Sequence, residues 1–376
     1  MTDNNNNRRN AAMHNANRLK LGVFAANCSS GTAVTKVAER WDASWDNNLA
    51  LAQMVDRSGI EFMLPIARWR GYGGETDFEG ASLETITWAC GLLAHTKDLN
   101  VFGTVHAPLV HPIFAAKQMV TVDHISGGRF GLNIVCGWNQ DEFEMFGVEQ
   151  REHDERYDYG QEWWDVVRRL WEEDQPFDFD GRYFTFKSAR GDPKPFGGTR
   201  PVVMNAGSSP PGQRFAARNC DMLFTTLVDP ERARNSIAGI TKLADGFGRN
   251  VDIYTSTNVV CRATRQEAEE YHHYYAIENA DEEGVDRLME LQGLYAQTYP
   301  KEILGSLRTR FAAGHGSYTI IGDPDHVARE YQQITEFGFS GATMAMVNYL
   351  DNLPLFIEEV LPRLEKLGLR EPAVNS

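Results

Sequence analysis

The sequence predicts a (β/α)8 TIM barrel with insertions, and three observations carry that prediction. Short apolar runs and amphipathic helical segments alternate about eight times along the chain, which is the pattern of parallel strands joined by helices. The strand runs are almost continuously apolar, as expected for strands that are buried on both faces. The first strand is followed by Asn27-Cys28-Ser29-Ser30-Gly31, which lacks the GxGxxG pattern of a dinucleotide-binding open sheet, the alternative fold.

Length and composition limit which domain organisations and which classes of partner are plausible for this chain. The chain has 376 residues, and we expect a polar, disordered tail over residues 1–18 followed by a single barrel domain over residues 19–376. The formal net charge of −15 argues against a nucleic-acid or anionic-membrane partner. Five scattered cysteines without a CxxC pair suggest neither zinc nor a disulfide framework, and they favour the cytoplasm. The chain shows neither an apolar signal segment nor an 18-residue apolar run.

The expected elements follow in chain order. Eight barrel strands are expected at residues 19–25, 61–66, 99–105, 130–135, 201–206, 221–227, 253–261 and 341–347. Helices are expected at residues 43–57, 83–95, 112–125, 157–173, from 208–212 onward, and at 230–247, 325–337 and 352–367. Residues 177–186 alternate around Asp180-Gly181 and predict a β-hairpin insertion. Residues 265–307 read as a long helical region that decorates the barrel.

The expected fourth strand, residues 130–135, is the segment around which the site is predicted. Its one polar residue, Asn133, either bonds the neighbouring backbone or faces a polar ligand. In a barrel the ligand lies at the carboxyl ends of the strands. The candidates there are Leu64, Arg68, Thr104, His106, Asn133, Cys136, Trp138, Ser208, Ser209 and Thr226. Apolar walls with a few polar groups suit a planar, partly polar organic ligand.

Two short motifs suggest a phosphate-bearing cofactor whose ring lies near Asn133. Ser208-Ser209 opens a helix, where backbone N–H groups attract phosphate, although a plain helix cap explains the pair equally well. Arg156-Tyr157 begins another helix and is able to hold a phosphate through a charge-assisted bond. Glu142 is the best ligand candidate in an acidic loop that otherwise reads as a solvated face.

Other chemistries lack their signals. His106 and His111 have no third partner at metal spacing, so we expect no metal site, and His106 reads as a substrate contact or proton donor. The candidate list is poor in carboxylates, which disfavours paired-carboxylate hydrolysis. The chain contains no GxSxG motif of a serine hydrolase.

Four segments of the chain are distinctive: RWRGYGGETDF, TVDHISGGRFGLNIVCGWNQDEFEMFG, EHDERYDY and NAGSSPPGQRFAAR. They resemble the bacterial-luciferase-like flavin monooxygenases, in particular the branch that holds the pyrimidine and dimethylsulfone monooxygenases. The resemblance runs over about residues 19–364. The first loop, ANCSSGTAVTKVAERW, is more similar to the sulfone branch than to the pyrimidine branch.

The resemblance implies a set of site residues. Flavin contacts are implied at Ala67, Arg68, Asn133, Glu142, Arg156, Tyr157 and Ser209. Ser208 is a cofactor-binding candidate from its place at the helix start. An oxygen-holding pocket is implied at Leu64, Thr104 and Asn133, and His106 flanks the implied substrate space. Arg68 is expected to stabilise developing negative charge.

The resemblance also implies the reaction. It implies a monooxygenase that takes reduced FMN from a separate flavin reductase. The enzyme is expected to use O2 to cleave a C–N or C–S bond in a small organic compound. A homodimer or homotetramer is expected. Three alternatives stay open: a riboflavin-degrading oxygenase, a deazaflavin-dependent dehydrogenase and a non-catalytic flavin-binding protein. All eight strand candidates are present, which favours an enzyme over the last of these.

Overall fold

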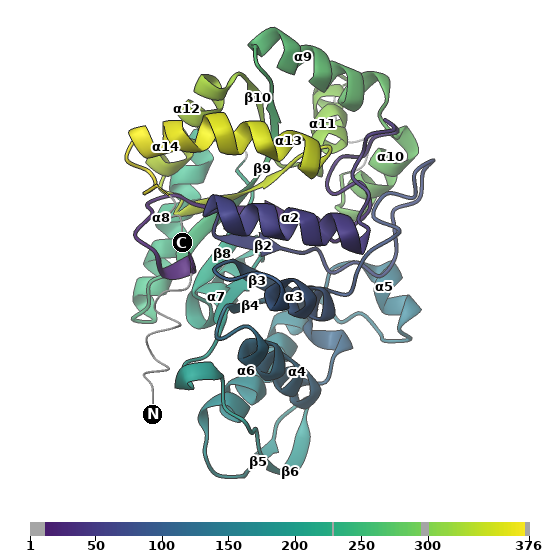
Figure 1. The fold of residues 1–376 in the computed structure, drawn as a ribbon. Helices are drawn as coiled ribbons and strands as arrows, with labels where there is room; N and C mark the ends of the chain where they lie inside the picture. Colours follow the sequence, from purple (N-terminus) through teal and green to yellow (C-terminus); the bar gives the residue numbers. More distant parts are fainter. Residues whose placement is uncertain (1–11, 228, 295–300, 373–376) are drawn as a thin grey trace.

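A closed barrel of eight parallel strands forms the centre of the computed structural model, which describes residues 12–227, 229–294 and 301–372 (Figure 1). The strands follow chain order around the barrel, and β11 closes it by pairing with both β9 and β1. They are β1 (Lys20–Phe24), β2 (Phe62–Leu64), β3 (Asn100–His106), β4 (Phe130–Val135), β7 (Val202–Asn205), β8 (Met222–Thr225), β9 (Asp252–Cys261) and β11 (Gly341–Ala345). The predicted (β/α)8 barrel is confirmed, and every expected strand overlaps an observed one.

Helices surround the barrel. They are α2 (Trp45–Ser58), α3 (Thr85–Ala94), α4 (Pro112–Ile125), α6 (His153–Glu172), α7 (Pro210–Asn219), α8 (Pro230–Gly246), α12 (Pro324–Glu336), α13 (Tyr349–Leu355), η6 (Phe356–Val360) and α14 (Leu361–Lys366). Shorter helices are η1 (Ala12–His14), η2 (Ala107–Leu109), α5 (Gln140–Met145) and η3 (Phe196–Gly198). The predicted hairpin is present as β5 (Phe177–Asp180) and β6 (Thr185–Ala189), which pair antiparallel. It projects from the barrel at the bottom of Figure 1.

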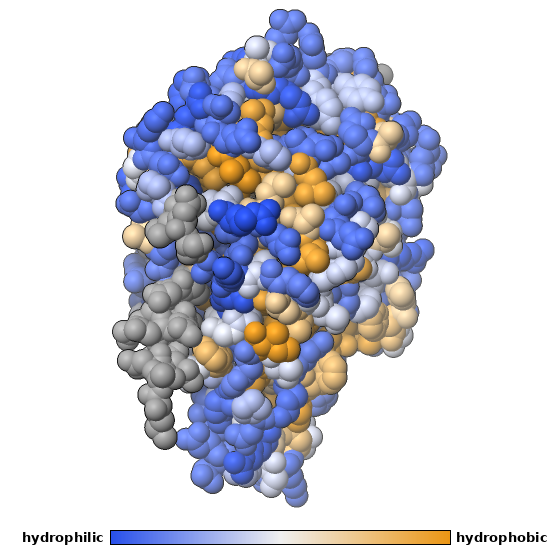
Figure 2. Space-filling view, viewed as in Figure 1, coloured by the Kyte–Doolittle hydropathy of each residue, from blue (hydrophilic) through white to orange (hydrophobic). Residues whose placement is uncertain are grey.

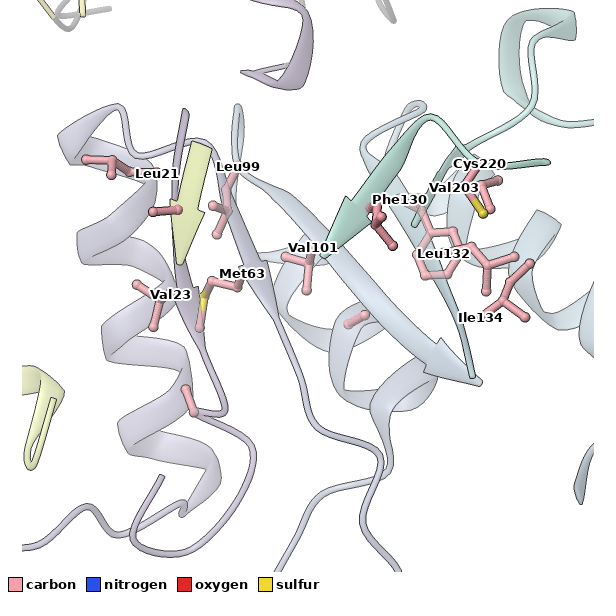
Figure 3. Packing of buried hydrophobic residues seen from close by; sticks show 14 of the residues in the cluster. Leu21, Val23, Met63, Leu99, Val101, Phe130, Leu132, Ile134, Val203 and Cys220 are labelled. Atoms are coloured by element: carbon pink, nitrogen blue, oxygen red, sulfur yellow. The ribbon is translucent and has the colours of Figure 1, made fainter. Parts of the chain in front are cut away.

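The main hydrophobic core fills the layer between the strands and the helices. Figure 3 shows part of it, with Leu21, Met63 and Val101 contributed by neighbouring strands. The three tryptophans of α6, Trp163, Trp164 and Trp171, are all buried in this layer. Core packing therefore accounts for the tryptophan-rich pattern of this helix.

The inside of the barrel holds a separate apolar cluster, and the segment before β1 covers it. Phe62, Leu64, Phe102, Met204, Met222 and Tyr254 pack together there with Met13 of η1. Asn15 and Asn17 donate hydrogen bonds to the buried carboxylate of Glu61. Residues 12–18, expected to be disordered, thus have a defined conformation, because these contacts hold a polar segment against the barrel. Residues 1–11 of the expected tail lie outside the described residues.

The segment between β9 and β11 forms an excursion with its own apolar cluster. It contains α9 (Arg265–His273), η4 (Tyr274–Glu278), α10 (Glu282–Leu291), α11 (Lys301–Gly314) and β10 (Tyr318–Gly322). The sequence did not predict β10, which pairs in parallel with the carboxyl-terminal half of β9, residues 257–261. The expected helical region breaks where Asp281 caps α10, and its residues 295–300 lie outside the described residues. Asp281 also accepts hydrogen bonds from Glu75 and Thr76, which ties the excursion to the β2–α3 loop.

The surface is largely polar. The face in Figure 2 is mostly hydrophilic, with hydrophobic side chains confined to narrow patches. Among the described residues, no helix combines the length and the apolar character that crossing a membrane requires.

Candidate functional site

Two cavities lie among the loops that follow the carboxyl ends of the barrel strands. The first, named here the Arg156 cavity, has a volume of about 280 Å³ and lies beyond β4 and β7. It is lined by residues 134–138, His153, Arg156, Tyr157 and residues 205–209. Four residues that the sequence predicted to bind the cofactor, Arg156, Tyr157, Ser208 and Ser209, therefore lie together.

Arg156 is held so that part of its guanidinium stays available. It lies in the first turn of α6, and its Nη1 atom donates a 2.8 Å hydrogen bond to the carbonyl of Gly137. In the described part of the chain, its buried Nε atom has no hydrogen-bond partner. A buried N–H left unpaired costs about 1–3 kcal/mol, so this side chain is suited to an anionic partner.

The loop after β7 passes close to Tyr157, and glycines permit the approach. A Cβ atom added to Gly212 would lie 2.6 Å from the Tyr157 hydroxyl, and one added to Gly207 would lie 2.9 Å from it. The same hydroxyl shares a hydrogen bond with Ser209, and burial raises the pKa of Tyr157. Ser209 caps α7 by accepting from Gly212, so a neutral residue stands at the positive end of this helix.

Asn133 is held beside Thr104 with its carbonyl oxygen left free. Its Nδ2 atom donates to the Thr104 hydroxyl at 3.2 Å, and that hydroxyl donates to the carbonyl of Pro65 at 2.8 Å. The buried Oδ1 atom of Asn133 has no partner among the described residues. Asn133 itself lines neither cavity: its neighbour Ile134 lines the Arg156 cavity, and its hydrogen-bond partner Thr104 lines the second cavity.

Leu64, the remaining residue of the predicted oxygen pocket, lies apart from both cavities. Its side chain is 1% exposed and packs inside the barrel with Phe62, Phe102 and Met204. It does not line either cavity. Its contacts are those of a core residue below the site.

The second cavity, named here the Arg68 cavity, has a volume of about 210 Å³ and lies beyond β2 and β3, against α3 and α4. It is lined by residues 67–69, Gly80, residues 82–86, residues 104–106, Leu109, Val110 and Gln118. The predicted residues Ala67, Arg68, Thr104 and His106 meet here.

Each nitrogen of the Arg68 guanidinium donates a hydrogen bond to a buried partner. Its Nε atom donates to Glu79 at 2.9 Å and its Nη1 atom donates to Glu142 at 2.9 Å. Its Nη2 atom donates to the hydroxyl of Tyr72 at 2.6 Å. Glu142 also accepts from the backbone N–H of Trp69, which fixes this carboxylate against the β2–α3 loop. Both carboxylates are buried, so one guanidinium faces two acidic groups.

Two histidines flank these carboxylates without adding positive charge. His106 Nε2 lies 4.0 Å from Glu142, and His315 Nδ1 lies 3.6 Å from Glu79. Burial lowers the pKa of His106 to about 4 and the pKa of His315 to about 3. Both rings are therefore neutral at pH 7. The Nδ1 atom of His106 is buried and, among the described residues, has no partner.

Sequence reasoning missed Glu79, Tyr72 and His315. Tyr72 and Glu79 lie in the long glycine-rich loop after the second strand, and the length of such a loop is the signal that could have drawn attention to them. His315 gave no local signal, because the excursion brings it to the site from the far end of the chain. Within the described residues, no group of three or more histidine, cysteine or acidic side chains is arranged to hold a metal ion.

Comparisons with known proteins identify the family. The family model for luciferase-like monooxygenases matches residues 19–341. The chain is 30% identical to pyrimidine monooxygenase RutA of Cronobacter turicensis over 353 residues, which cover 92% of each protein. The solved structure of the riboflavin lyase RcaE, with modified FMN and riboflavin, aligns with a TM-score of 0.83 and 23% identity, covering 95% of this chain and 94% of that one. DmoA from Hyphomicrobium sulfonivorans aligns with a TM-score of 0.83 and 20% identity, covering 96% and 92%. The chain belongs to the luciferase-like monooxygenase family.

Proposed function

We propose that this protein is the oxygenase of a two-component system, which takes reduced FMN from a separate reductase and uses O2 to cleave a C–N or C–S bond in a small organic compound. The observation that carries the proposal is the Arg156 cavity, where a tyrosine and two serines converge with an arginine whose Nε atom has no partner among the described residues. Its similarity to a pyrimidine monooxygenase supports the choice of bond. Five free cysteines support a cytoplasmic location.

The residues present fit FMN. The free Nε atom of Arg156 and the hydroxyls of Ser208 and Ser209 are donors suited to a phosphate. The positive end of α7 adds a favourable dipole. The free Oδ1 atom of Asn133 is an acceptor suited to a ring N–H. Arg156, Tyr157, Ser208 and Ser209 would hold the phosphate end, with Asn133 toward the ring.

The protein's own residues bind, orient and exclude water. Reduced FMN, when bound, supplies the electrons that activate O2. The Pro65 carbonyl and Thr104 hold the Asn133 amide in one orientation, so that its oxygen is presented as an acceptor. His106 is a neutral ring in the Arg68 cavity and is able to accept or donate a proton at Nδ1. Because two carboxylates already balance Arg68, we assign it to holding Glu142 rather than to stabilising developing negative charge.

The test is oxygen consumption by the purified protein with reduced FMN from a flavin reductase. Pyrimidines, sulfones and riboflavin are the substrates to screen, with products identified by mass spectrometry. We expect the protein to form hydrogen peroxide when no substrate is present, and to form an oxygenated cleavage product when its own substrate is added. Consumption of riboflavin alone would move the assignment to flavin degradation. If the protein consumes no oxygen but oxidises an alcohol with a deazaflavin, the chain is a dehydrogenase. If it binds flavin and shows neither activity, it is a flavin-binding protein.

A further inference from the structure

The Arg68 cavity contains two features that normally attract anions. One is a buried arginine, whose guanidinium matches the geometry of carboxylate, sulfonate and phosphate groups. The other is the amino-terminal end of α3, where backbone N–H groups without a partner inside the helix and the helix dipole favour negative charge. Acidic side chains of the protein itself occupy both features.

The positive charge of Arg68 is balanced by the carboxylates that bind it. With Glu79 and Glu142 both ionised, two negative charges face one positive charge. Burial raises the pKa of Glu79 while Arg68 opposes that shift, and a proton on Glu79 would leave one charge against one. In neither state does the group have a net positive charge. The neutral rings of His106 and His315 do not change this balance.

The amino-terminal end of α3 is closed in the same way. The side chain of Glu84 caps the helix and accepts from the backbone N–H groups of Ile86 at 3.0 Å and Thr87 at 2.8 Å. The donors that would bind an anion are therefore already bound to a carboxylate that lines the cavity. An entering anion would meet negative charge at both places.

What remains open in the cavity is neutral. The Nδ1 atom of His106 is buried without a partner in the part of the chain that the structure describes, and Gln118 lines the wall. Leu83, Ile86 and Leu109 supply apolar surface. A volume of about 210 Å³ admits only a small molecule.

We propose that the Arg68 cavity binds a small, uncharged polar molecule as the substrate, and that Glu79, Glu142 and Glu84 exclude carboxylates, sulfonates and phosphates from it. The proposal rests on the proposed function in one respect, because it takes the occupant of this cavity to be the substrate. The exclusion of anions depends only on the protein's charges, so it is testable without turnover and without a known substrate.

The experiment places a cysteine in the cavity and measures its reaction with two charged probes. Gln118→Cys is labelled with methanethiosulfonates that are similar in size but carry an anionic sulfonatoethyl or a cationic trimethylammonioethyl group. Gln333→Cys, an exposed glutamine on α12, is the matched control for the overall negative charge of the protein. Labelling of the native cysteines is measured on the unsubstituted protein and subtracted. At each position, the ratio of the anionic to the cationic labelling rate is divided by the same ratio for a free thiol in solution.

We expect the anionic probe to be disfavoured at position 118 by about tenfold relative to position 333. Glu79→Gln should reduce that preference. Leu109→Cys provides a second position in the same cavity, so a folding defect at position 118 leaves the question answerable. The proposal would be overturned if the ratio of anionic to cationic labelling rates were the same at the cavity and control positions, or if the anionic probe were preferred in the cavity. It would also be overturned if neither probe reacted at either cavity position. Labelling is measured with and without FMN, and the flavin-free result stands even if the proposed oxygenase activity fails.

Discussion

The two cavities of this barrel are built from the same two parts and have opposite electrostatic character. Each combines an arginine with the amino-terminal end of a helix. In the Arg156 cavity the helix is capped by the neutral Ser209, and the Nε atom of the arginine has no hydrogen-bond partner among the described residues. In the Arg68 cavity the helix is capped by Glu84, and two further carboxylates bind the arginine. The immediate partners of an arginine thus decide whether it marks an anion site.

Removing each arginine should separate the two roles, and the largest effect is expected at Arg68. Arg68→Ala leaves Glu79 and Glu142 buried without their cation, which should lower the free energy of unfolding by about 3–5 kcal/mol. Urea unfolding measures this loss. The matched control is Arg168→Ala, which breaks an exposed pair with Glu172 and should cost at most about 1 kcal/mol. A similar, small loss for both variants would contradict a tightly coupled cluster around Arg68.

Arg156→Ala should act on the cofactor instead of on stability. Loss of a charge-assisted bond to phosphate costs about 1.5–3 kcal/mol, so the affinity for FMN should fall about tenfold to a hundredfold. Riboflavin, which has the same ring system and lacks the phosphate, should bind the variant and the unsubstituted protein equally. Flavin fluorescence titration measures both affinities. If both flavins lose affinity alike, Arg156 contacts the ring or maintains the cavity and does not select the phosphate.

The neutrality of His106 should appear in the pH dependence of stability. Its folded-state pKa of about 4 lies below the ordinary value of 6.5, so between these pH values the unfolded chain binds a proton that the folded chain does not. Stability should therefore fall as the pH is lowered from 6.5 toward 4, and this residue alone should account for about 2 kcal/mol at pH 5.

Urea unfolding of the unsubstituted protein and of His106→Gln at pH 7 and pH 5 measures that share. His315 titrates in the same direction in both proteins and cancels in the difference. An identical pH dependence in the two proteins would mean that His106 is not a buried, neutral ring.

The smallest expected effect concerns the cap of α3. Glu84→Gln keeps a carbonyl oxygen that is able to accept from Ile86 or Thr87 but removes the negative charge. Labelling of Gln118→Cys by the anionic probe should become about two to five times faster, in line with the modest energy of a charge at a helix end. Glu358→Gln, at an exposed position in η6, is the control and should leave the rate unchanged. Equal rates with and without the Glu84 substitution would limit the exclusion of anions to Glu79 and Glu142.

The barrel was predictable from the sequence because its strands are local patterns. The apolar run of β4 gave that strand its exact bounds, Phe130–Val135, and the glycines around it marked its ends. Strand β10 was not predicted, because it pairs with the carboxyl-terminal half of β9 outside the repeat of eight barrel strands. Residues 12–18 read as a polar tail, because the acceptor that orders them, Glu61, follows in the chain only after α2.

The site was predictable only in part, for a similar reason. Helix starts and strand ends gave Arg156, Ser209 and Thr104, whose positions follow from the barrel topology. The partners of Arg68 were not predictable, because it pairs with Glu79 and Glu142, and the latter lies 74 residues away in the chain. The environment of a buried charge depends on tertiary contacts, and periodicity and composition carry no record of them.

A crystal structure of the protein with bound FMN tests the central contrast most directly. The account predicts the phosphate in the Arg156 cavity, within hydrogen-bond distance of Arg156 and Ser209, with Arg68 still paired to Glu79 and Glu142. A phosphate beside Arg68, with either carboxylate displaced from it, would contradict the account.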